Sequence, residues 1–126
     1  MNVKVLVVED DRDYRLIIEE YLKPAGMEVR AAKNGEEALE ILKTYSPDIA
    51  LVDWMMPRLD GEAFCRALRA DPRHARLPIL MVTVKKEAEE QAEALHFGAD
   101  GFINKPFKPE ELRSRIQALL RIRAAS

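Results

Sequence analysis

Three acidic residues stand side by side near the start of the chain. In the segment "VKVLVVEDD", an unbroken apolar run ends at Glu9, Asp10 and Asp11. One acid, for which Asp11 is the candidate, is enough to cap the helix expected to follow. Carboxylates this close repel one another, and burying them without a positive partner costs free energy. The pattern therefore predicts a cation near these acids that the polypeptide itself does not supply.

Other polar residues follow apolar segments later in the chain. Asp53 ends "DIALVD", Thr83 ends "PILMVT", and Lys105 follows "GFIN". If these segments are strands of one parallel sheet, their carboxyl ends meet at the edge where such sheets bind ligands. Carboxylates, a hydroxyl and an ammonium together can hold a hard divalent cation and a phosphoryl group, and oxygen ligands suit Mg²⁺.

The elements that must position these residues follow from the apolar pattern. Apolar runs predict strands at residues 3–8, 27–32, 48–53, 78–83 and 101–104. Helical spacing predicts helices at residues 11–23, 35–45, 61–70 and 86–97, with a last helix opening at Pro109. Strands alternating with helices predict an α/β fold, in which helices cover both faces of a doubly wound parallel sheet.

Two of the expected helices carry more specific expectations. In helix 61–70, Phe64, Ala67 and Leu68 are expected to face inward, and Cys65 to face the surface or its boundary. Helix 86–97 is rich in alanine and glutamate, so its apolar face is thin. Few buried contacts would oppose a shift of this helix, which makes it a candidate movable element.

Composition limits the classes of function. The chain has 126 residues, 48% of them hydrophobic and 33% charged, which suits one domain spanning residues 1–126 with no output domain. A net charge of −2 gives no basic bias toward nucleic acid. The single cysteine excludes an internal disulfide and fits a reducing compartment. No apolar run approaches the roughly 20 residues of a membrane span, so a cytoplasmic domain is expected.

Taken together, the motifs resemble those of a known family. "VVEDD", "LVDWMMPRLDG", "MVT" and "GADGFINKPF" occur in the order and approximate spacing found in receiver domains of two-component response regulators. The resemblance covers essentially the whole chain. It implies a flavodoxin-like sheet of five strands in the order 2-1-3-4-5 with five helices. It also implies a signalling module that catalyses only its own phosphorylation and dephosphorylation.

The resemblance implies a phosphoacceptor and its metal ligands. Asp53 would accept a phosphoryl group from a phosphohistidine on a sensor histidine kinase or phosphotransfer protein. An aspartate needs no general base for this attack, because it is ordinarily ionised at neutral pH. Asp10, Asp53 and the main-chain carbonyl of Met55 would ligate Mg²⁺, and Glu9 would act through a water.

The resemblance also implies a switch. Thr83 would bond a phosphoryl oxygen, and Lys105 would pair with Asp53 before phosphorylation and with the phosphoryl group afterwards. Phe102 would change rotamer, a role compatible with a core position, and the Lys105–Pro106 peptide would be cis. The surface of the fourth helix, fifth strand and fifth helix would then signal to an effector or output domain, or form a homodimer.

Several positions depart from the family pattern. Val84 stands where a small residue is usual and would narrow access to Asp53. Met55 and Lys85 occupy two positions that often tune hydrolysis, and methionine cannot bond strongly to an attacking water, so slow self-dephosphorylation is expected. Gly101 replaces a second acid common in receivers of winged-helix transcription factors.

The arginines of the last helix leave two interpretations open, a solvated helix face or salt bridges across a dimer. They are Arg113, Arg115, Arg121 and Arg123. His74 and His96 are expected at the surface, because neither has a spaced partner for a zinc site.

Three other functions compete with the receiver interpretation. A phosphatase with an aspartate nucleophile would place the nucleophile after the first strand, with an acid two residues later. A flavin mononucleotide binder would need a Ser/Thr/Gly-rich phosphate loop where this chain has "EDD". A degenerate receiver would only bind partners, although the acids, Thr83 and Lys105 are all present.

Overall fold

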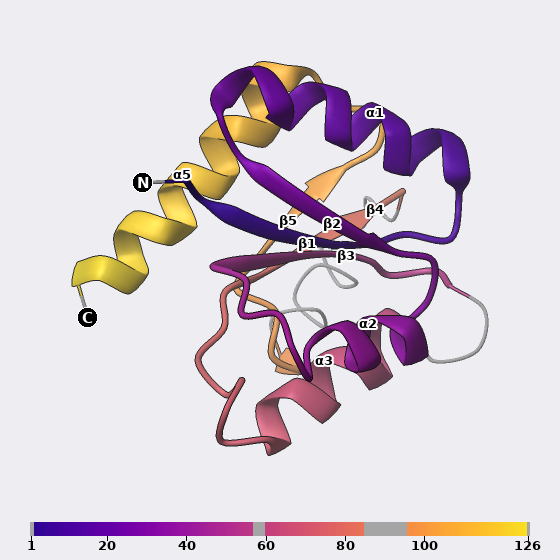
Figure 1. Cartoon of the computed structure of the whole chain (residues 1–126), viewed down its shortest axis with the longest axis vertical. Coiled ribbons are helices and arrows are strands. Elements are labelled where there is room, and N and C mark those ends of the chain that lie inside the picture. The colour runs from indigo at the N-terminus through magenta and orange to yellow at the C-terminus, as the bar shows by residue number, and fades with distance from the viewer. Residues whose placement is uncertain (1, 57–59, 85–95, 126) are drawn as a thin grey trace.

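The sheet has the predicted order. The computed structural model describes residues 2–56, 60–84 and 96–125. Five parallel strands lie in the order β2-β1-β3-β4-β5, which confirms the doubly wound flavodoxin-like prediction (Figure 1). The strands are β1 (Lys4–Val8), β2 (Glu28–Ala32), β3 (Ile49–Asp53), β4 (Ile79–Thr83) and β5 (Gly101–Asn104).

Helices cover both faces of this sheet. They are α1 (Arg12–Leu22), α2 (Gly35–Ile41), α3 (Gly61–Ala70) and α5 (Pro109–Ala125), with a short 3₁₀ turn, η1 (Lys23–Ala25). The helix expected at residues 86–97 falls almost wholly outside the described residues, as does its thin apolar face. Within the described ranges, no helix combines the length and apolar character that a membrane span requires.

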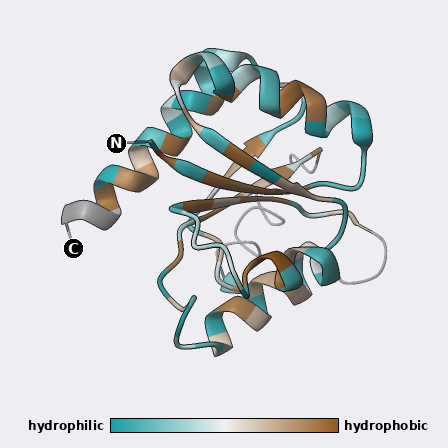
Figure 2. Cartoon of the chain, in the orientation of Figure 1, coloured by the Kyte–Doolittle hydropathy of each residue, from teal (hydrophilic) through white to brown (hydrophobic). Residues whose placement is uncertain are grey.

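The core consists of two layers, one on each face of the sheet. Alternate strand residues such as Val7 and Leu51 pack with α1 and α5, and their neighbours Val8 and Val52 pack with α2 and α3. Figure 1 shows these two helix pairs on opposite sides of the strands. Because both faces are covered, the central strands are almost continuously apolar, as Figure 2 shows by colour.

Side-chain caps set where the first two helices begin. Asp11 accepts hydrogen bonds from the backbone N–H groups of Asp13, at 2.9 Å, and Tyr14, at 3.4 Å, which confirms its predicted capping role. Asn34 likewise accepts from the N–H of Glu37 at 2.8 Å. The helix that Asn34 caps is shorter than predicted, because α2 ends at Ile41 and turns follow.

The predicted orientation of α3 is wrong in one respect. Its buried residues are Gly61, Phe64, Cys65 and Leu68, and Ala67 is exposed. A Cβ at Gly61 would lie only 2.6 Å from the carbonyl oxygen of Asp53, so the helix approaches the end of β3 as closely as a glycine permits. Cys65 stands four residues after Gly61, on the same face of the helix, and it is fully buried in the core.

Candidate functional site

Three carboxylates converge where β1 and β3 end. These strands are neighbours in the sheet, with Val8 in register with Val52, so the residues that follow them share one edge. Ligand oxygens of Glu9, Asp10 and Asp53 all lie within 4.8 Å of one another. The chain leaves β1 toward β2 on one side while β3 lies on the other, and this reversal is where doubly wound sheets bind ligands.

Asp53 is almost enclosed. It is 5% exposed, and its Oδ1 accepts a hydrogen bond from the N–H of Met55 at 3.2 Å. Burial raises the pKa of Asp53, the hydrogen bond and charge of Glu9 raise it further, and the charge of Lys105 lowers it. In the metal-free protein, this raised pKa contradicts the expectation that the carboxyl of Asp53 is ionised at neutral pH.

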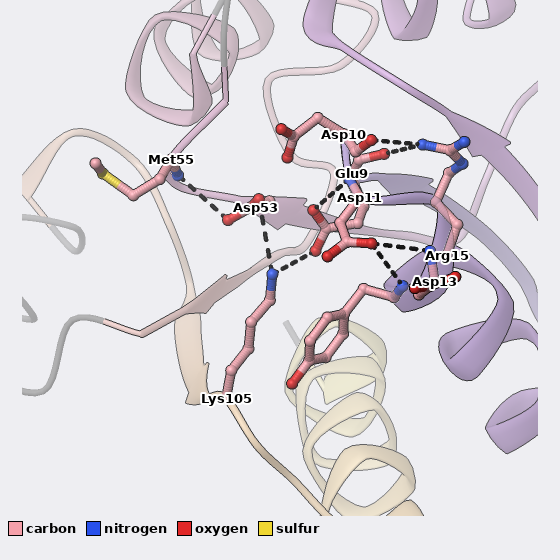
Figure 3. A network of polar contacts seen from close by, with 9 residues as sticks. Glu9, Asp10, Asp11, Asp13, Arg15, Asp53, Met55 and Lys105 are labelled. Atoms are coloured by element: carbon pink, nitrogen blue, oxygen red, sulfur yellow. Dashed lines mark hydrogen bonds and ion pairs between the residues drawn. The ribbon is translucent and has the colours of Figure 1, made fainter.

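Lys105 reaches the acids from the end of β5. Its Nζ lies 2.6 Å from Oε1 of Glu9 and 3.7 Å from Oδ2 of Asp53 (Figure 3). The predicted pairing with Asp53 is therefore present, but Glu9 is the nearer partner. Burial alone would lower the pKa of Lys105, but the hydrogen bond to Glu9 and the charges of Asp53 and Glu9 outweigh it and raise that pKa. The predicted cis Lys105–Pro106 peptide is confirmed.

Thr83 and Phe102 lie on the same face of the sheet. Thr83 is fully buried at the end of β4. The parallel register pairs Met81 with Phe102 and Thr83 with Asn104, so Phe102 stands diagonally behind Thr83. Phe102 is half-buried and packs against the core layer of α2 and α3. Packing of Phe102 against the core is therefore shown, and its rotamer change stays a prediction.

Helix α1 contributes two residues that sequence reasoning missed. Nη1 of Arg15 donates to the carbonyl oxygens of Glu9, at 2.8 Å, and Asp10, at 3.0 Å (Figure 3). These bonds fix the backbone of the two acids that follow β1. The ring centroid of Tyr14 lies 4.2 Å from Nζ of Lys105. The available signal was position, because both residues stand in the first turn after the acids.

The convergent acids fit a hard divalent cation. Three carboxylates whose oxygens lie within 4.8 Å of one another offer the donors that Mg²⁺ prefers, and the ammonium of Lys105 already lies against one of them. A divalent ion would offset the repulsion that the sequence predicted. A water held by Glu9 and coordination by the carbonyl of Met55 stay predictions.

Comparison with known proteins identifies the family. Residues 5–117 match the family model of the response regulator receiver domain. This chain belongs to that family. Receiver domains are signalling modules, and the family sets aside the phosphatase and flavin mononucleotide alternatives.

Curated relatives and solved structures agree with this assignment. The receiver domain is 40% identical over 121 residues to the alkaline phosphatase synthesis transcriptional regulatory protein PhoP of Bacillus subtilis, covering 96% of this chain and 50% of PhoP. It is 41% identical over 118 residues to the probable transcriptional regulator ycf27 of Porphyridium aerugineum, covering 94% of this chain and 48% of that protein. The chain thus spans about half the length of these curated relatives.

Two solved structures show the same architecture. Chemotaxis protein CheY4 of Vibrio cholerae superposes with a TM-score of 0.89 and 34% identity, covering 94% of this chain and 99% of that one. NtrX from Brucella abortus superposes with a TM-score of 0.92 and 29% identity, covering 99% of this chain but 28% of that one. The same receiver architecture therefore occurs as nearly a whole chain in one protein and as a small part of another.

Four further residues stand within two positions of Asp53 or Thr83 in the sequence. Trp54 is buried and packs edge-on against Phe97, with ring centroids 5.5 Å apart. Met55 and Val84 are 59% and 62% exposed. Lys85 lies outside the described residues.

Two of the four arginines of α5 make hydrogen bonds within the domain. Arg113 donates to the carbonyl oxygen of Tyr21 at 3.1 Å, and Arg115 donates to that of Phe102 at 3.2 Å. Arg121 is exposed, and the side chain of Arg123 is not among those described. These internal contacts account for two of the four arginines without a dimer.

Proposed function

We propose that this receiver domain accepts a phosphoryl group on Asp53 from a phosphohistidine of a sensor histidine kinase or phosphotransfer protein. The observation that supports this most directly is the enclosure of Asp53 at the carboxyl edge, beside Glu9, Asp10 and the ammonium of Lys105. A carboxylate held at a strand end beside an ammonium and two further acids that could share a cation is placed to attack phosphorus, and phosphoryl transfer depends mainly on positioning and charge neutralisation.

In the proposed reaction, one carboxylate oxygen of Asp53 forms the new bond to phosphorus. The bond from phosphorus to the donor imidazole nitrogen breaks, and that nitrogen keeps the bonding electrons. Mg²⁺ held by Asp10, Asp53 and the main-chain carbonyl of Met55, with Glu9 acting through a water, would supply charge neutralisation and favour the ionised form of the nucleophile. Lys105 would then pair with a phosphoryl oxygen.

The resulting acyl phosphate would bias a switch. It adds charge and acceptor oxygens beside β4, where the hydroxyl of Thr83 can move to bond one of them. Such a movement would vacate space on the face that Thr83 shares with Phe102, and Phe102 could fill it. The altered surface would comprise the segment at residues 86–97, β5 and α5.

The partners follow from this assignment as proposals. The relative PhoP is named a transcriptional regulatory protein and is about twice as long as the match. We expect this receiver to control an output domain or separate effector in the cytoplasm, with no direct contact to nucleic acid or membrane of its own. Light scattering with beryllofluoride, which mimics the phosphoryl group, would test homodimerisation, for which the expected surface is the fourth helix, β5 and α5.

Intact-mass measurement after incubation with acetyl phosphate and Mg²⁺ tests the function. The wild-type domain should gain one phosphoryl group, and Asp53→Asn should gain none. Asp13→Asn removes an exposed acid from the same region and should behave as wild type. Failure of the wild-type domain to gain mass, with acetyl phosphate or a phosphorylated histidine protein, would instead favour the degenerate receiver that only binds partners.

A further inference from the structure

The ammonium of Lys105 has a third neighbour besides its two carboxylates. Its Nζ lies 4.2 Å from the ring centroid of Tyr14, well inside the roughly 6 Å over which a cation is attracted to an aromatic face. Tyr14 comes from the first turn of α1, whereas Lys105 follows β5, so the contact joins opposite ends of the chain. We propose that Tyr14 is a positioning residue that holds Lys105 over the phosphoacceptor.

The ring of Tyr14 is itself held in place. It packs against Phe107 with ring centroids 5.9 Å apart, and Phe107 packs edge-on against Tyr21 at 6.0 Å. The cap at the start of α1 fixes the Tyr14 backbone through its N–H. Because Phe107 follows Lys105 by two residues, the segment after β5 is bound to α1 through both side chains.

This contact matters because Lys105 must change partners in the proposed reaction, on which the inference rests. In the structure its nearest partner is Glu9, at 2.6 Å, and Asp53 is farther away at 3.7 Å. To reach a phosphoryl oxygen on Asp53, the ammonium must loosen its bond to Glu9. A lysine has a flexible four-carbon stem that could then swing into solvent.

An aromatic face suits this exchange because it attracts the ammonium without using an acceptor on either carboxylate. Glu9 and Asp53 therefore stay available to a metal ion or a phosphoryl group, while the ring of Tyr14 keeps Nζ above them. The phenol hydroxyl takes no part in this role, so phenylalanine should replace tyrosine and an aliphatic residue should not.

Nuclear magnetic resonance of the metal-free, unphosphorylated domain tests the contact directly. The aromatic face should shift the ε-methylene protons of Lys105 upfield in the wild type and in Tyr14→Phe, and this shift should disappear in Tyr14→Leu. Phosphorylation by acetyl phosphate should be about 3-fold to 10-fold slower in Tyr14→Leu and near the wild-type rate in Tyr14→Phe. Tyr14→Met provides a second non-aromatic variant if Tyr14→Leu does not fold.

Tyr21→Leu is the matched control. It removes another ring of the same aromatic cluster from the same helix, but that ring contacts Phe107 and not Lys105. It should keep both the upfield shift and the rate of phosphorylation. An equal slowing in Tyr21→Leu would show that packing alone matters, and an unchanged rate in Tyr14→Leu would overturn the positioning role.

The two failures can be told apart. If the wild-type domain accepts no phosphoryl group, the proposed function fails and the role of Tyr14 fails with it. If the wild type is phosphorylated but Tyr14→Phe is as slow as Tyr14→Leu, only the aromatic role of Tyr14 is overturned.

Discussion

Nζ of Lys105 lies 2.6 Å from Oε1 of Glu9, joining residues that are 96 positions apart in the chain. The two side chains are only 11% and 2% exposed, so this is a buried ion pair. Removing one member of such a pair leaves an unpaired charge with little access to water, which costs more than the pair itself contributes. In this protein the unpaired charge would be one of three neighbouring carboxylates.

Lys105→Met should therefore destabilise the metal-free domain by about 3–5 kcal/mol. Lys108→Met, which replaces an exposed lysine three residues later, should change stability by less than about 0.5 kcal/mol. Urea unfolding in the presence of a chelator measures both variants. Added Mg²⁺ should narrow the difference in free energy of unfolding between Lys105→Met and the wild type, since an ion at the acids replaces the lost positive charge. Equal losses in the two variants would contradict this account.

The raised pKa of Asp53 predicts a pH dependence of stability. The folded-state pKa is about 8 against an ordinary 3.8, so ionising the carboxyl costs stability in the folded state. Without divalent cations, the contribution of Asp53 to the free energy of unfolding should fall as pH rises from about 4 to about 8. Asp53→Asn lacks the cost and should be more stable than wild type at pH 8, by about 1–3 kcal/mol, but not near pH 4.

Thermal unfolding of both proteins at the two pH values, with a chelator present, makes this comparison. Mg²⁺ should raise the stability of the wild type more than that of Asp53→Asn. An Asp53→Asn variant that is less stable than wild type at pH 8 would show that the carboxylate does not carry a net cost.

Cys65 should be unreactive in the folded protein. The side chain is fully buried, and burial raises the pKa of its thiol to about 12, so almost no thiolate forms at pH 8. Ellman's reagent should react slowly in buffer and rapidly in urea. A variant carrying Cys65→Ala and Ala67→Cys moves the thiol to the exposed side of α3 and should react rapidly without urea. Fast reaction of the native wild type would contradict the burial of Cys65.

The phosphorylated domain should lose its phosphoryl group slowly, over minutes or longer. Met55 is 59% exposed beside Asp53, and its thioether cannot bond strongly to an attacking water. Met55→Asn supplies such a bond and should speed decay about fivefold, whereas Met55→Ala should stay slow. Mass spectrometry after removal of acetyl phosphate gives both rates. Faster decay in Met55→Ala than in Met55→Asn would argue that access, not hydrogen bonding, limits hydrolysis.

Arg69 should matter for stability although it is remote from the acids. Its guanidinium donates to the carbonyl oxygens of Leu77, at 2.7 Å, and Gly98, at 2.9 Å, and to Oδ2 of Asp100, at 2.7 Å. It thus joins α3 to the segments before β4 and β5. Arg69→Met should lower the free energy of unfolding by about 2–4 kcal/mol. Arg66→Met, on the exposed side of the same helix, should cost less than about 1 kcal/mol in the same urea titration.

The strands and the polar residues that stand at their carboxyl ends could be predicted from the sequence for a simple reason. In a parallel sheet covered on both faces, strands are short apolar runs, and the polar residue that ends each run stands at the ligand-binding edge. Asp53 and Thr83 were found in this way. Caps such as Asp11 act on N–H groups two or three residues away, so they too could be inferred locally.

The rotation of α3 could not be inferred in this way. Its apolar residues allow more than one inward face, and on the observed face Gly61 approaches the end of β3 to a distance that leaves no room for a Cβ. That distance is set by packing between segments and not by helical periodicity. Cys65 therefore lies in the core, against the prediction, and Ala67 lies outside.

The sequence by itself determined the order of elements, the run of acids after the first strand and the presence of a lysine after the last one. Only the tertiary structure decided that Lys105 bonds most closely to Glu9 and that its ammonium lies over the ring of Tyr14. The physical reason is that residue types and local periodicity specify which groups reach the edge of the sheet. Which of several nearby partners a flexible side chain touches depends on distances of a few ångströms between segments far apart in the chain.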